Sequence, residues 1–263
     1  MILKMYQIDA FSSAVFGGNP AAVVPLDVWL DDETLQAIAT ENSLSETAYT
    51  VPLDNGYELR WFTPSAEIDL CGHATLATAF VVFNYLQPQW QKVRFQTRVS
   101  GELTVTRDGA MLAMDFPAMA ADPCNPPEGV AAGLGAVPNA VYAGQDYLAV
   151  FSSTAEVLAI EPDYTVLSTL QHRGVIVTAP GGDDNDADFV SRFFCPKYGV
   201  PEDPVCGSAH CMLTPYWAEV TGKSTLVAHQ VSARGGVLHC VLNGERVHLK
   251  GEAVQYLEGQ IRI

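Results

Sequence analysis

The order of hydrophobic and polar residues predicts a chain of many short strands and a few helices. Residues 1–11 and 21–25 are apolar runs of β type. The segment 16–20 between them, Phe-Gly-Gly-Asn-Pro, carries the residues that mark tight turns. The chain is therefore expected to open with a hairpin.

A first helix is expected where apolar residues recur at helical spacing, at Leu35, Ile38 and Ala39. Asp31 precedes this run as a good helix-starting residue, and the pattern fades near Asn42. Beyond it, strands are expected over 45–51 and 57–62, a buried helix over 74–86, and two further strands within 95–116 around the turn Asp108-Gly109.

Two stretches of the chain are versions of one motif, Glu67 to Ala74 and Glu202 to Ala209. Cys206 follows Cys71 by 135 residues, about half of the 263-residue chain, and the same offset relates Leu103 to Leu238. Two copies are too few for a solenoid, so a closed pseudo-twofold pair is the better interpretation. The second copy predicts strands over 140–151, a helix over 154–160, strands over 174–178 and 188–194, a helix after Cys206-Gly207-Ser208 and a hairpin at Asn243-Gly244.

The expected fold is therefore of the α+β class, with mixed α/β content and two pseudo-symmetric halves. We place the first half at residues 1–119 and the second at 120–263, with the Ala-, Pro- and Gly-rich stretch 120–135 as a linker. The last strand, 255–263, either pairs within the second half or crosses back to the first.

Composition narrows the classes of function. The formal charge of −16 disfavours nucleic-acid binding and adsorption to anionic membranes, because both require clustered Lys and Arg. No apolar run reaches the roughly 18 residues that span a bilayer, and residues 1–11 lack the pattern of a secretory signal. The six cysteines are spread through a chain large enough to fold without disulfides. A cytoplasmic protein with reduced thiols is expected.

The repeated motif places Cys71-Gly72-His73 and Cys206-Gly207-Ser208 where a strand gives way to a helix. A helix start has unpaired N–H groups and a partial positive charge, so it can hold a carboxylate, and glycine lets the ligand approach closely. Two such starts related by pseudo-symmetry predict a cleft for a small anionic ligand. Asn19 in the first turn is a further candidate for the lining of this cleft.

Five segments together resemble the phenazine-biosynthesis PhzF family over essentially the whole chain. They are Phe16 to Pro20, Glu41 to Thr47, Arg60 to Pro64, Asp69 to Thr75 and Glu202 to Ala209. The resemblance implies the fold of diaminopimelate epimerase, in which each half is a mixed sheet curled around a central helix and the active site lies between the halves.

The resemblance also implies residue roles. Glu46 becomes the acid/base residue, with His73, Asp203 and Ser208 around the substrate. The interpretation of the two helix starts and of the first turn, and not the resemblance, makes Gly72, Gly207, Cys71, Cys206 and Asn19 candidate binding residues. Members of the family are cofactor-free isomerases and typically homodimers. The best-known member isomerises a dihydro-hydroxyanthranilate.

The residues around Glu46 allow a test of that assignment. Glu46 begins the expected strand of the first half, whereas the corresponding strand 174–178, Gly-Val-Ile-Val-Thr, has no carboxylate. A single base can remove a proton and return it to another carbon on the same face. The asymmetry therefore favours an isomerisation by allylic or 1,5-type transposition.

Two other functions remain open. Cys71 and Cys206 could act as the thiol pair of an epimerase, since helix starts lower a thiol pKa, although His73 replaces the Asn expected there. The chain could also be a non-catalytic binder of small acids. A metal site at Cys206, His210 and Cys211 is not expected, because no second ligand pair has suitable spacing.

Overall fold

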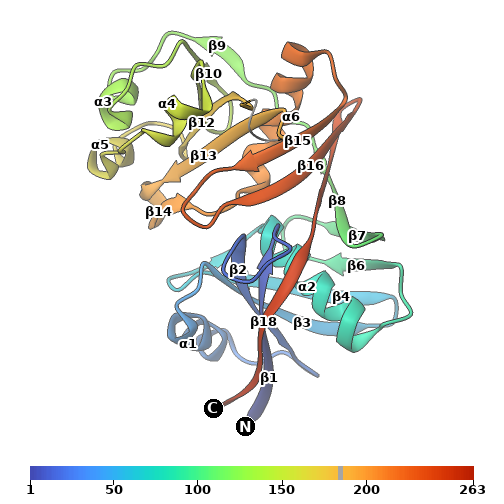
Figure 1. The fold of residues 1–263 in the computed structure, drawn as a ribbon. Helices are drawn as coiled ribbons and strands as arrows, with labels where there is room; N and C mark the ends of the chain where they lie inside the picture. Colours follow the sequence, from blue (N-terminus) through green and yellow to red (C-terminus); the bar gives the residue numbers. More distant parts are fainter. Residues whose placement is uncertain (183–185) are drawn as a thin grey trace. The chain divides into compact units, whose positions relative to one another are not determined.

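The computed structural model describes residues 1–182 and 186–263. The chain forms two compact units, which are drawn in Figure 1. Unit 1 comprises Met1–Asp115 and Lys250–Ile263, and unit 2 comprises Phe116–Leu249. Each unit contains both helices and a mixed sheet, and each is described by itself.

The sheet of unit 1 runs in the order β18-β1-β2-β3-β4-β6-β7-β8. The pairs β2–β3 and β4–β6 are parallel, and the other neighbours are antiparallel. The expected opening hairpin is confirmed, with Tyr6 opposite Val23. The helices and strands of unit 1 are β1 Ile2–Ala10, β2 Asn19–Pro25, α1 Asp32–Asn42, β3 Glu46–Leu53, β4 Gly56–Phe62, β5 Glu67–Ile68, α2 Gly72–Val81, the π-helix η1 Val82–Leu86, β6 Lys92–Gln96, β7 Glu102–Asp108, β8 Met111–Pro117 and β18 Ala253–Arg262.

The sheet of unit 2 repeats the alternation of strand directions. It runs β9-β10-β11-β12-β13-β15-β16, and again two of the pairs, β11–β12 and β13–β15, are parallel. Its elements are β9 Asp122–Cys124, α3 Val130–Leu134, β10 Ala140–Ala143, β11 Tyr147–Val150, α4 Thr154–Leu158, α5 Tyr164–Ser168, β12 Val175–Pro180, β13 Phe189–Cys195, the 3-10 helix η2 Pro196–Tyr198, β14 Val200–Asp203, α6 Gly207–Thr221, β15 Thr225–Gln230, β16 Gly236–Asn243 and β17 Arg246–Gly251.

One helix in each unit is buried on nearly every side. In α2 the first turn and the residues after it are almost all buried, and the helix packs against β1, β2 and β3. In α6 the buried positions extend from Gly207 to Trp217, and the helix packs against β15 and β16. A helix that is apolar all round belongs inside a core. The expected fold class, a mixed sheet with a central helix in each half, is confirmed.

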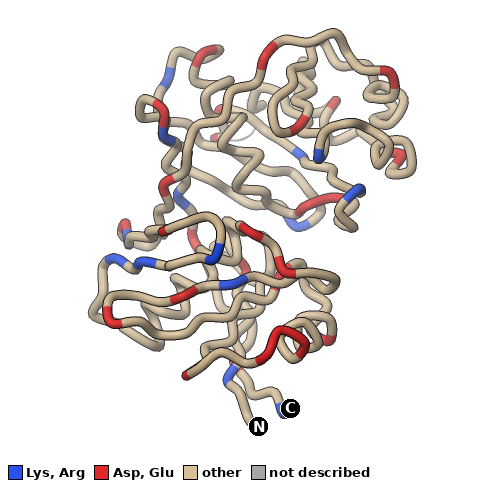
Figure 2. Tube along the Cα trace, turned by 180° about the vertical axis from the view of Figure 1, so that it is seen from behind, with Lys and Arg blue, Asp and Glu red and all other residues tan. Residues whose placement is uncertain are grey.

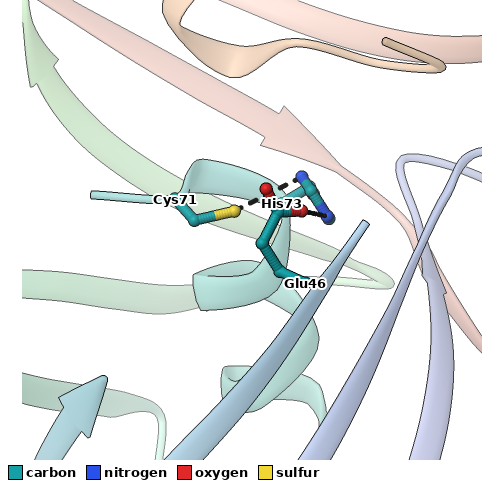
Figure 3. A group of neighbouring side chains, drawn as sticks. All are labelled: Glu46, Cys71 and His73. Carbon is teal, nitrogen blue, oxygen red and sulfur yellow. Dashed lines mark hydrogen bonds and ion pairs between the residues drawn. The ribbon is translucent and has the colours of Figure 1, made fainter. Parts of the chain in front are cut away.

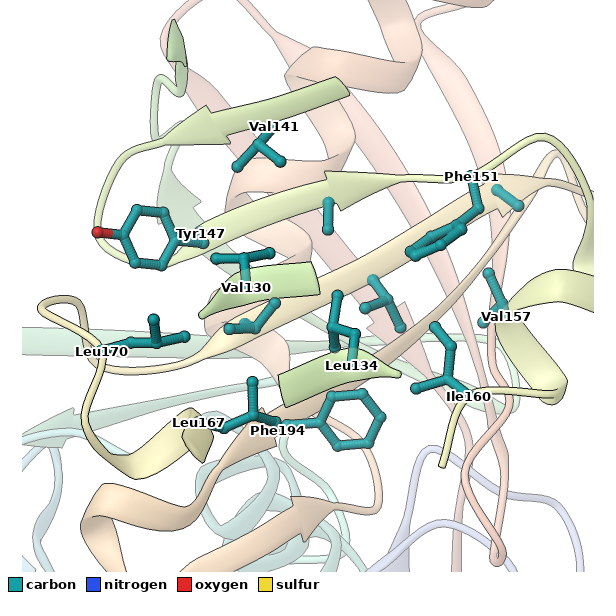
Figure 4. Packing of buried hydrophobic residues seen from close by; sticks show 14 of the residues in the cluster. Val130, Leu134, Val141, Tyr147, Phe151, Val157, Ile160, Leu167, Leu170 and Phe194 are labelled. Carbon is teal, nitrogen blue, oxygen red and sulfur yellow. The ribbon is translucent and has the colours of Figure 1, made fainter. Parts of the chain in front are cut away.

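Smaller helices cover the sheets from the other side. In unit 1, α1 packs on the strands through Leu35, Ile38 and Ala39, the residues whose spacing predicted it. In unit 2, α3, α4 and α5 supply Val130, Val157 and other apolar side chains to a core that Figure 4 shows from close by.

The stretch 120–135 is not a linker, contrary to expectation. It contains β9, which pairs antiparallel with β10, and α3, which inserts Val130 and Leu134 into the core. The glycines that suggested a linker are helix ends: Gly129 and Gly135 flank α3 with φ of 101° and 66°. Glycine adopts such positive φ angles without strain.

The last strand, whose path the sequence left open, pairs antiparallel with β1 in unit 1. Ala253 lies opposite Ala10, and Arg262 lies opposite Ile2. The predicted helix over 74–86 is present but changes from α to π geometry at Val82. Acidic residues are spread over both units in Figure 2. Among the described helices, none is long and apolar enough to cross a membrane.

Candidate functional site

Unit 1 brings four of the candidate residues together at the start of α2. Cys71 is the N-cap residue, with extended backbone angles and no side-chain capping bond, and His73 follows in the first turn. Glu46 is the first residue of β3, and Asn19 is the first residue of the neighbouring parallel strand β2. Glu46, Cys71 and His73 lie side by side in Figure 3.

The imidazole of His73 links the group. Its Nε2 lies 3.0 Å from Glu46 Oε2. Its Nδ1 lies 3.5 Å from Cys71 Sγ and 3.1 Å from Asn19 Nδ2. Ser45 donates to Asn19 Oδ1 at 3.2 Å. The ring is therefore held between a carboxylate on one side and a thiol and an amide on the other.

Glu46 and His73 are nearly shielded from water. Their side chains are 13% and 6% exposed. Glu46 Oε2 and His73 Nε2 form a close ion pair at 3.0 Å, and neither atom has another hydrogen-bond partner within residues 1–182 and 186–263. Buried polar atoms in native proteins usually have further partners, so a buried pair whose only contact is with each other marks a place where a ligand or a proton can bind.

Charge interactions set the protonation of this group. Burial lowers the pKa of His73, but its contacts with Cys71 and Glu46 outweigh burial and raise that pKa well above 6.5. Burial, followed by the charge of Glu46, raises the pKa of the Cys71 thiol. The surroundings thus favour the charged form of the His73 imidazole and the neutral form of the Cys71 thiol.

Unit 2 has a second group at the start of α6. Cys206 is the N-cap residue, its Sγ lies 3.2 Å from Ser208 Oγ, and its backbone N–H donates to Gln230 at 2.9 Å. Asp203 Oδ1 accepts from the N–H of Val205 at 3.2 Å, before the helix begins. Burial, then the charge of Asp203, raises the pKa of Cys206 well above 9.0.

The expectation that helix starts lower the thiol pKa at these two positions is wrong. Cys71 and Cys206 are 7% and 6% exposed, and the desolvation of a buried thiolate exceeds the stabilisation from the helix start. Both side chains are neutral thiols near neutral pH.

A family model described as phenazine biosynthesis-like protein, PhzC-PhzF, matches residues 8–259. The chain belongs to this family. An uncharacterized isomerase of Pseudomonas aeruginosa is 52% identical over the whole of both chains. A crystal structure of a PhzF family protein from Enterococcus faecalis has a TM-score of 0.96 and 45% identity, covering 100% of each chain.

A more distant neighbour shows that the fold is wider than the family. The hydroxyproline epimerase of Agrobacterium vitis, solved with trans-4-hydroxy-L-proline bound, has a TM-score of 0.64 and 11% identity, and covers 99% of this chain and 92% of its own. At this identity the likeness concerns the fold alone. The epimerase-like fold expected from the sequence is thus confirmed for this PhzC-PhzF chain.

A repeated ion pair holds equivalent strands in the two units of this family member. Arg60 donates to both carboxylate oxygens of Glu67, at 2.7 and 2.8 Å. Arg192 donates to both oxygens of Glu202, at 2.7 and 3.0 Å. Residues that repeat with the same partner belong to the scaffold. The differences between the two helix starts are therefore the features that bear on function.

Sequence reasoning missed two charged residues beside Ser208. Arg173 donates to Ser208 Oγ at 2.8 Å and to both oxygens of Asp146, at 3.0 and 2.6 Å. The only signal in the sequence is their position: Asp146 directly precedes the apolar strand β11, and Arg173 lies two residues before the apolar strand β12. Neither position matches a family segment that the sequence displays.

One set of side chains in the described residues has the composition of a metal site. The ligand atoms of Glu46, Cys71 and His73 all lie within 4.8 Å of one another, so they could hold a cation such as Zn²⁺. The set considered in the sequence analysis was a different one, Cys206, His210 and Cys211. In that set His210 uses Nδ1 to contact the carbonyl oxygen of Cys206 at 2.8 Å.

Proposed function

We propose that the chain is a cofactor-independent isomerase that moves a proton on a small carboxylate, with Glu46 as its acid/base residue. The proposal rests on the buried ion pair of Glu46 Oε2 and His73 Nε2 at 3.0 Å, neither of which has another hydrogen-bond partner among the described residues. The names of three relatives in two bacterial species, all uncharacterized isomerases, agree with it.

His73 prepares Glu46 for this role. In the proposal Glu46 starts as the base, and His73 Nε2, 3.0 Å from Glu46 Oε2, holds the carboxylate in place. Glu46 takes a proton from one carbon of the substrate, and the electron pair of the broken C–H bond enters the adjacent π system. The protonated Glu46 then returns the proton to another carbon on the same face, which restores the carboxylate.

The remaining candidate residues have binding roles in the proposal. Gly72 and Gly207 occupy the first position of α2 and α6, where backbone N–H groups are available to a carboxylate. Ser208 adds a hydroxyl at the second start. Asp203, which precedes α6, is proposed to orient a substrate amine or hydroxyl.

The two-thiol mechanism has less support in the geometry. It needs one cysteine as thiolate, and burial raises the pKa of both Cys71 and Cys206. It also predicts matched environments for the two thiols. Instead, Cys71 contacts an imidazole and Cys206 contacts a hydroxyl.

A screen in heavy water tests the proposal. Amino and hydroxy carboxylates, both saturated and unsaturated, are incubated with the protein in D₂O and read by mass spectrometry. We expect at least one to gain deuterium with the wild-type chain and with Glu41→Gln, an exposed carboxylate on α1. Glu46→Gln should slow the uptake by about 10²–10⁴-fold. Ligand binding without any deuterium uptake would support a non-catalytic binder instead.

A further inference from the structure

Strand register aligns the two units residue by residue around the candidate site. Thr47 of β3 lies opposite Phe62, and Val175 of β12 lies opposite Phe194. The two phenylalanines hold the same place in the repeated strands Arg60-Trp61-Phe62 and Arg192-Phe193-Phe194. The residue before Thr47 is Glu46, so its equivalent in unit 2 is Gly174.

The same alignment pairs two more positions. Ser45 precedes Glu46, so its equivalent is Arg173. On the neighbouring parallel strands, Ala22 lies beside Thr47, and Tyr147 lies beside Val175. Ala21 is therefore equivalent to Asp146. Unit 2 carries an arginine and an aspartate where unit 1 carries a serine and an alanine.

The place of the Glu46 side chain is filled in unit 2. A Cβ atom on Gly174 would lie 2.5 Å from the carbonyl oxygen of Phe194 and 2.7 Å from the ring of Phe193. That ring in turn supports Arg173, whose guanidinium carbon lies 5.1 Å from the ring centroid. Unit 2 therefore has no carboxylate at this position. It has instead a cation one residue earlier in the sequence, Arg173, which stacks on the Phe193 ring.

The guanidinium of Arg173 is fixed from two sides. Asp146, whose side chain is fully buried, accepts from Nε and Nη2 at 3.0 and 2.6 Å, and Ser208 Oγ accepts from Nη2 at 2.8 Å. Arg173 itself is 27% exposed. Its Nη1 has no partner within the residues that the structure describes. A guanidinium held in this way presents its remaining N–H groups in a fixed direction.

Stability alone does not account for this ion pair. Replacing a buried pair by apolar residues is often neutral or stabilising, because desolvation offsets the attraction. The equivalent place in unit 1 is built with Ser45 and Ala21. The fold itself therefore does not require charges there.

Ser208 is affected by the same contact. Because its oxygen accepts from Arg173, its single proton is left to be donated to another group. Cys206 Sγ at 3.2 Å can fill the second lone pair of Oγ as a thiol donor. The hydroxyl of Ser208 and the Nη1 of Arg173 are then two donors at one helix start.

We propose that Arg173 is a specificity-determining residue that binds a carboxylate group of the substrate together with Ser208, oriented by Asp146. The inference deepens the proposed isomerase function and rests on it in so far as the bound carboxylate is called a substrate. Binding of a carboxylate at Arg173 does not itself depend on proton transfer. It predicts selection of carboxylates over neutral amides of the same shape. The N–H groups of Nη1 and the hydroxyl of Ser208 suit this selection because they are donors that can each reach one oxygen of a carboxylate.

The test uses benzoate and acetate as probes, with benzamide and acetamide as their neutral counterparts. The full-length, ¹⁵N-labelled protein is titrated while the Nε–H signals of its arginines are followed by NMR. The Arg173 signal is assigned by its loss in Arg173→Lys. We expect that signal to shift saturably with benzoate or acetate and not with either amide.

Variants decide whether Arg173 is responsible. Arg173→Lys should raise the benzoate or acetate dissociation constant at least tenfold, whereas Arg262→Gln, an exposed arginine near the end of the chain, should leave it unchanged. The double variant Arg173→Gln/Asp146→Asn removes both charges together, so no buried charge is left unpaired if the single variant misfolds. Unchanged carboxylate affinity in either folded variant, or no saturable shift of the Arg173 signal with either acid, would overturn the proposal.

The same titration separates this inference from the isomerase proposal. Glu46→Gln should bind the carboxylate probes as the wild-type chain does. Binding at Arg173 without any deuterium uptake in the heavy-water screen would remove the isomerase function and leave the binding role of Arg173. Deuterium uptake by the wild-type chain, together with unchanged carboxylate binding by the Arg173 variants, would support the isomerase function and rule out the binding role of Arg173.

Discussion

Glu46 and Gly174 occupy equivalent positions in the two units, each directly before the strand residue that faces Phe62 or Phe194. The carboxylate of Glu46 contacts His73, whereas the space at Gly174 is taken by the Phe193 ring. The chain is thus symmetric in its scaffold and asymmetric in its titratable groups. This asymmetry favours chemistry by one acid/base residue.

Replacement of the thiols distinguishes the two mechanisms. We expect Cys71→Ser and Cys206→Ser each to keep the turnover rate within about tenfold of the wild-type rate, since neither thiol transfers a proton in the proposed mechanism. Steady-state kinetics on a substrate from the heavy-water screen provides the measurement. Losses as large as that of Glu46→Gln for both variants would establish the two-thiol mechanism instead.

The raised pKa of His73 makes the free energy of unfolding fall as the pH rises. Its folded-state pKa is raised above 6.5, so its contribution to folding is fully present below about pH 6.5 and is lost as pH rises through the raised value. The difference in unfolding free energy between the wild-type chain and His73→Gln should therefore shrink above pH 6.5. Urea unfolding between pH 6 and 9 checks this, and a difference that grows with pH would contradict it.

His210 produces the opposite dependence. Burial lowers its pKa to about 4, so the folded chain binds fewer protons than the unfolded chain between about pH 6.5 and pH 4. Acidification through this range should cost about 3 kcal/mol of unfolding free energy from this residue. His210→Gln should lose less stability than the wild-type chain on going from pH 7 to pH 4. Equal losses in urea titrations would show that His210 is not buried as a neutral ring.

Gly174 should tolerate no side chain. We expect Gly174→Ala to lower the unfolding free energy by about 1–3 kcal/mol, because the added Cβ would overlap a backbone oxygen and the Phe193 ring. Gly259→Ala is the matched control, since its Cβ would meet only Leu257 at 3.5 Å. Similar stability of both variants in thermal or urea unfolding would argue against the filled space.

The repeat in the sequence predicted most of the fold. Motifs around Cys71 and Cys206 place the two central helices correctly. The repeated strands β4 and β13 contain Arg60 and Arg192, which form the ion pairs to Glu67 and Glu202. Apolar periodicity and internal similarity are local or fixed-offset signals, so they are readable without the structure.

Other features depend on register and could not be read from the chain. The bond between Arg173 and Asp146 joins residues 27 positions apart, and only the pairing of β11 with β12 brings them together. The glycines around α3 look like those of a linker until their positive φ angles show them to be helix ends. The raised pKa of the thiols follows from burial, which is a property of the whole unit.

The central claim, that one residue both removes and returns the proton, is tested most directly by the fate of the proton itself. A substrate from the heavy-water screen is labelled with deuterium at the donor carbon and converted in H₂O under single-turnover conditions. A single Glu46 carboxylate, 13% exposed, predicts that part of the deuterium reappears at the acceptor carbon of the product. Complete loss of the label to solvent would contradict the account.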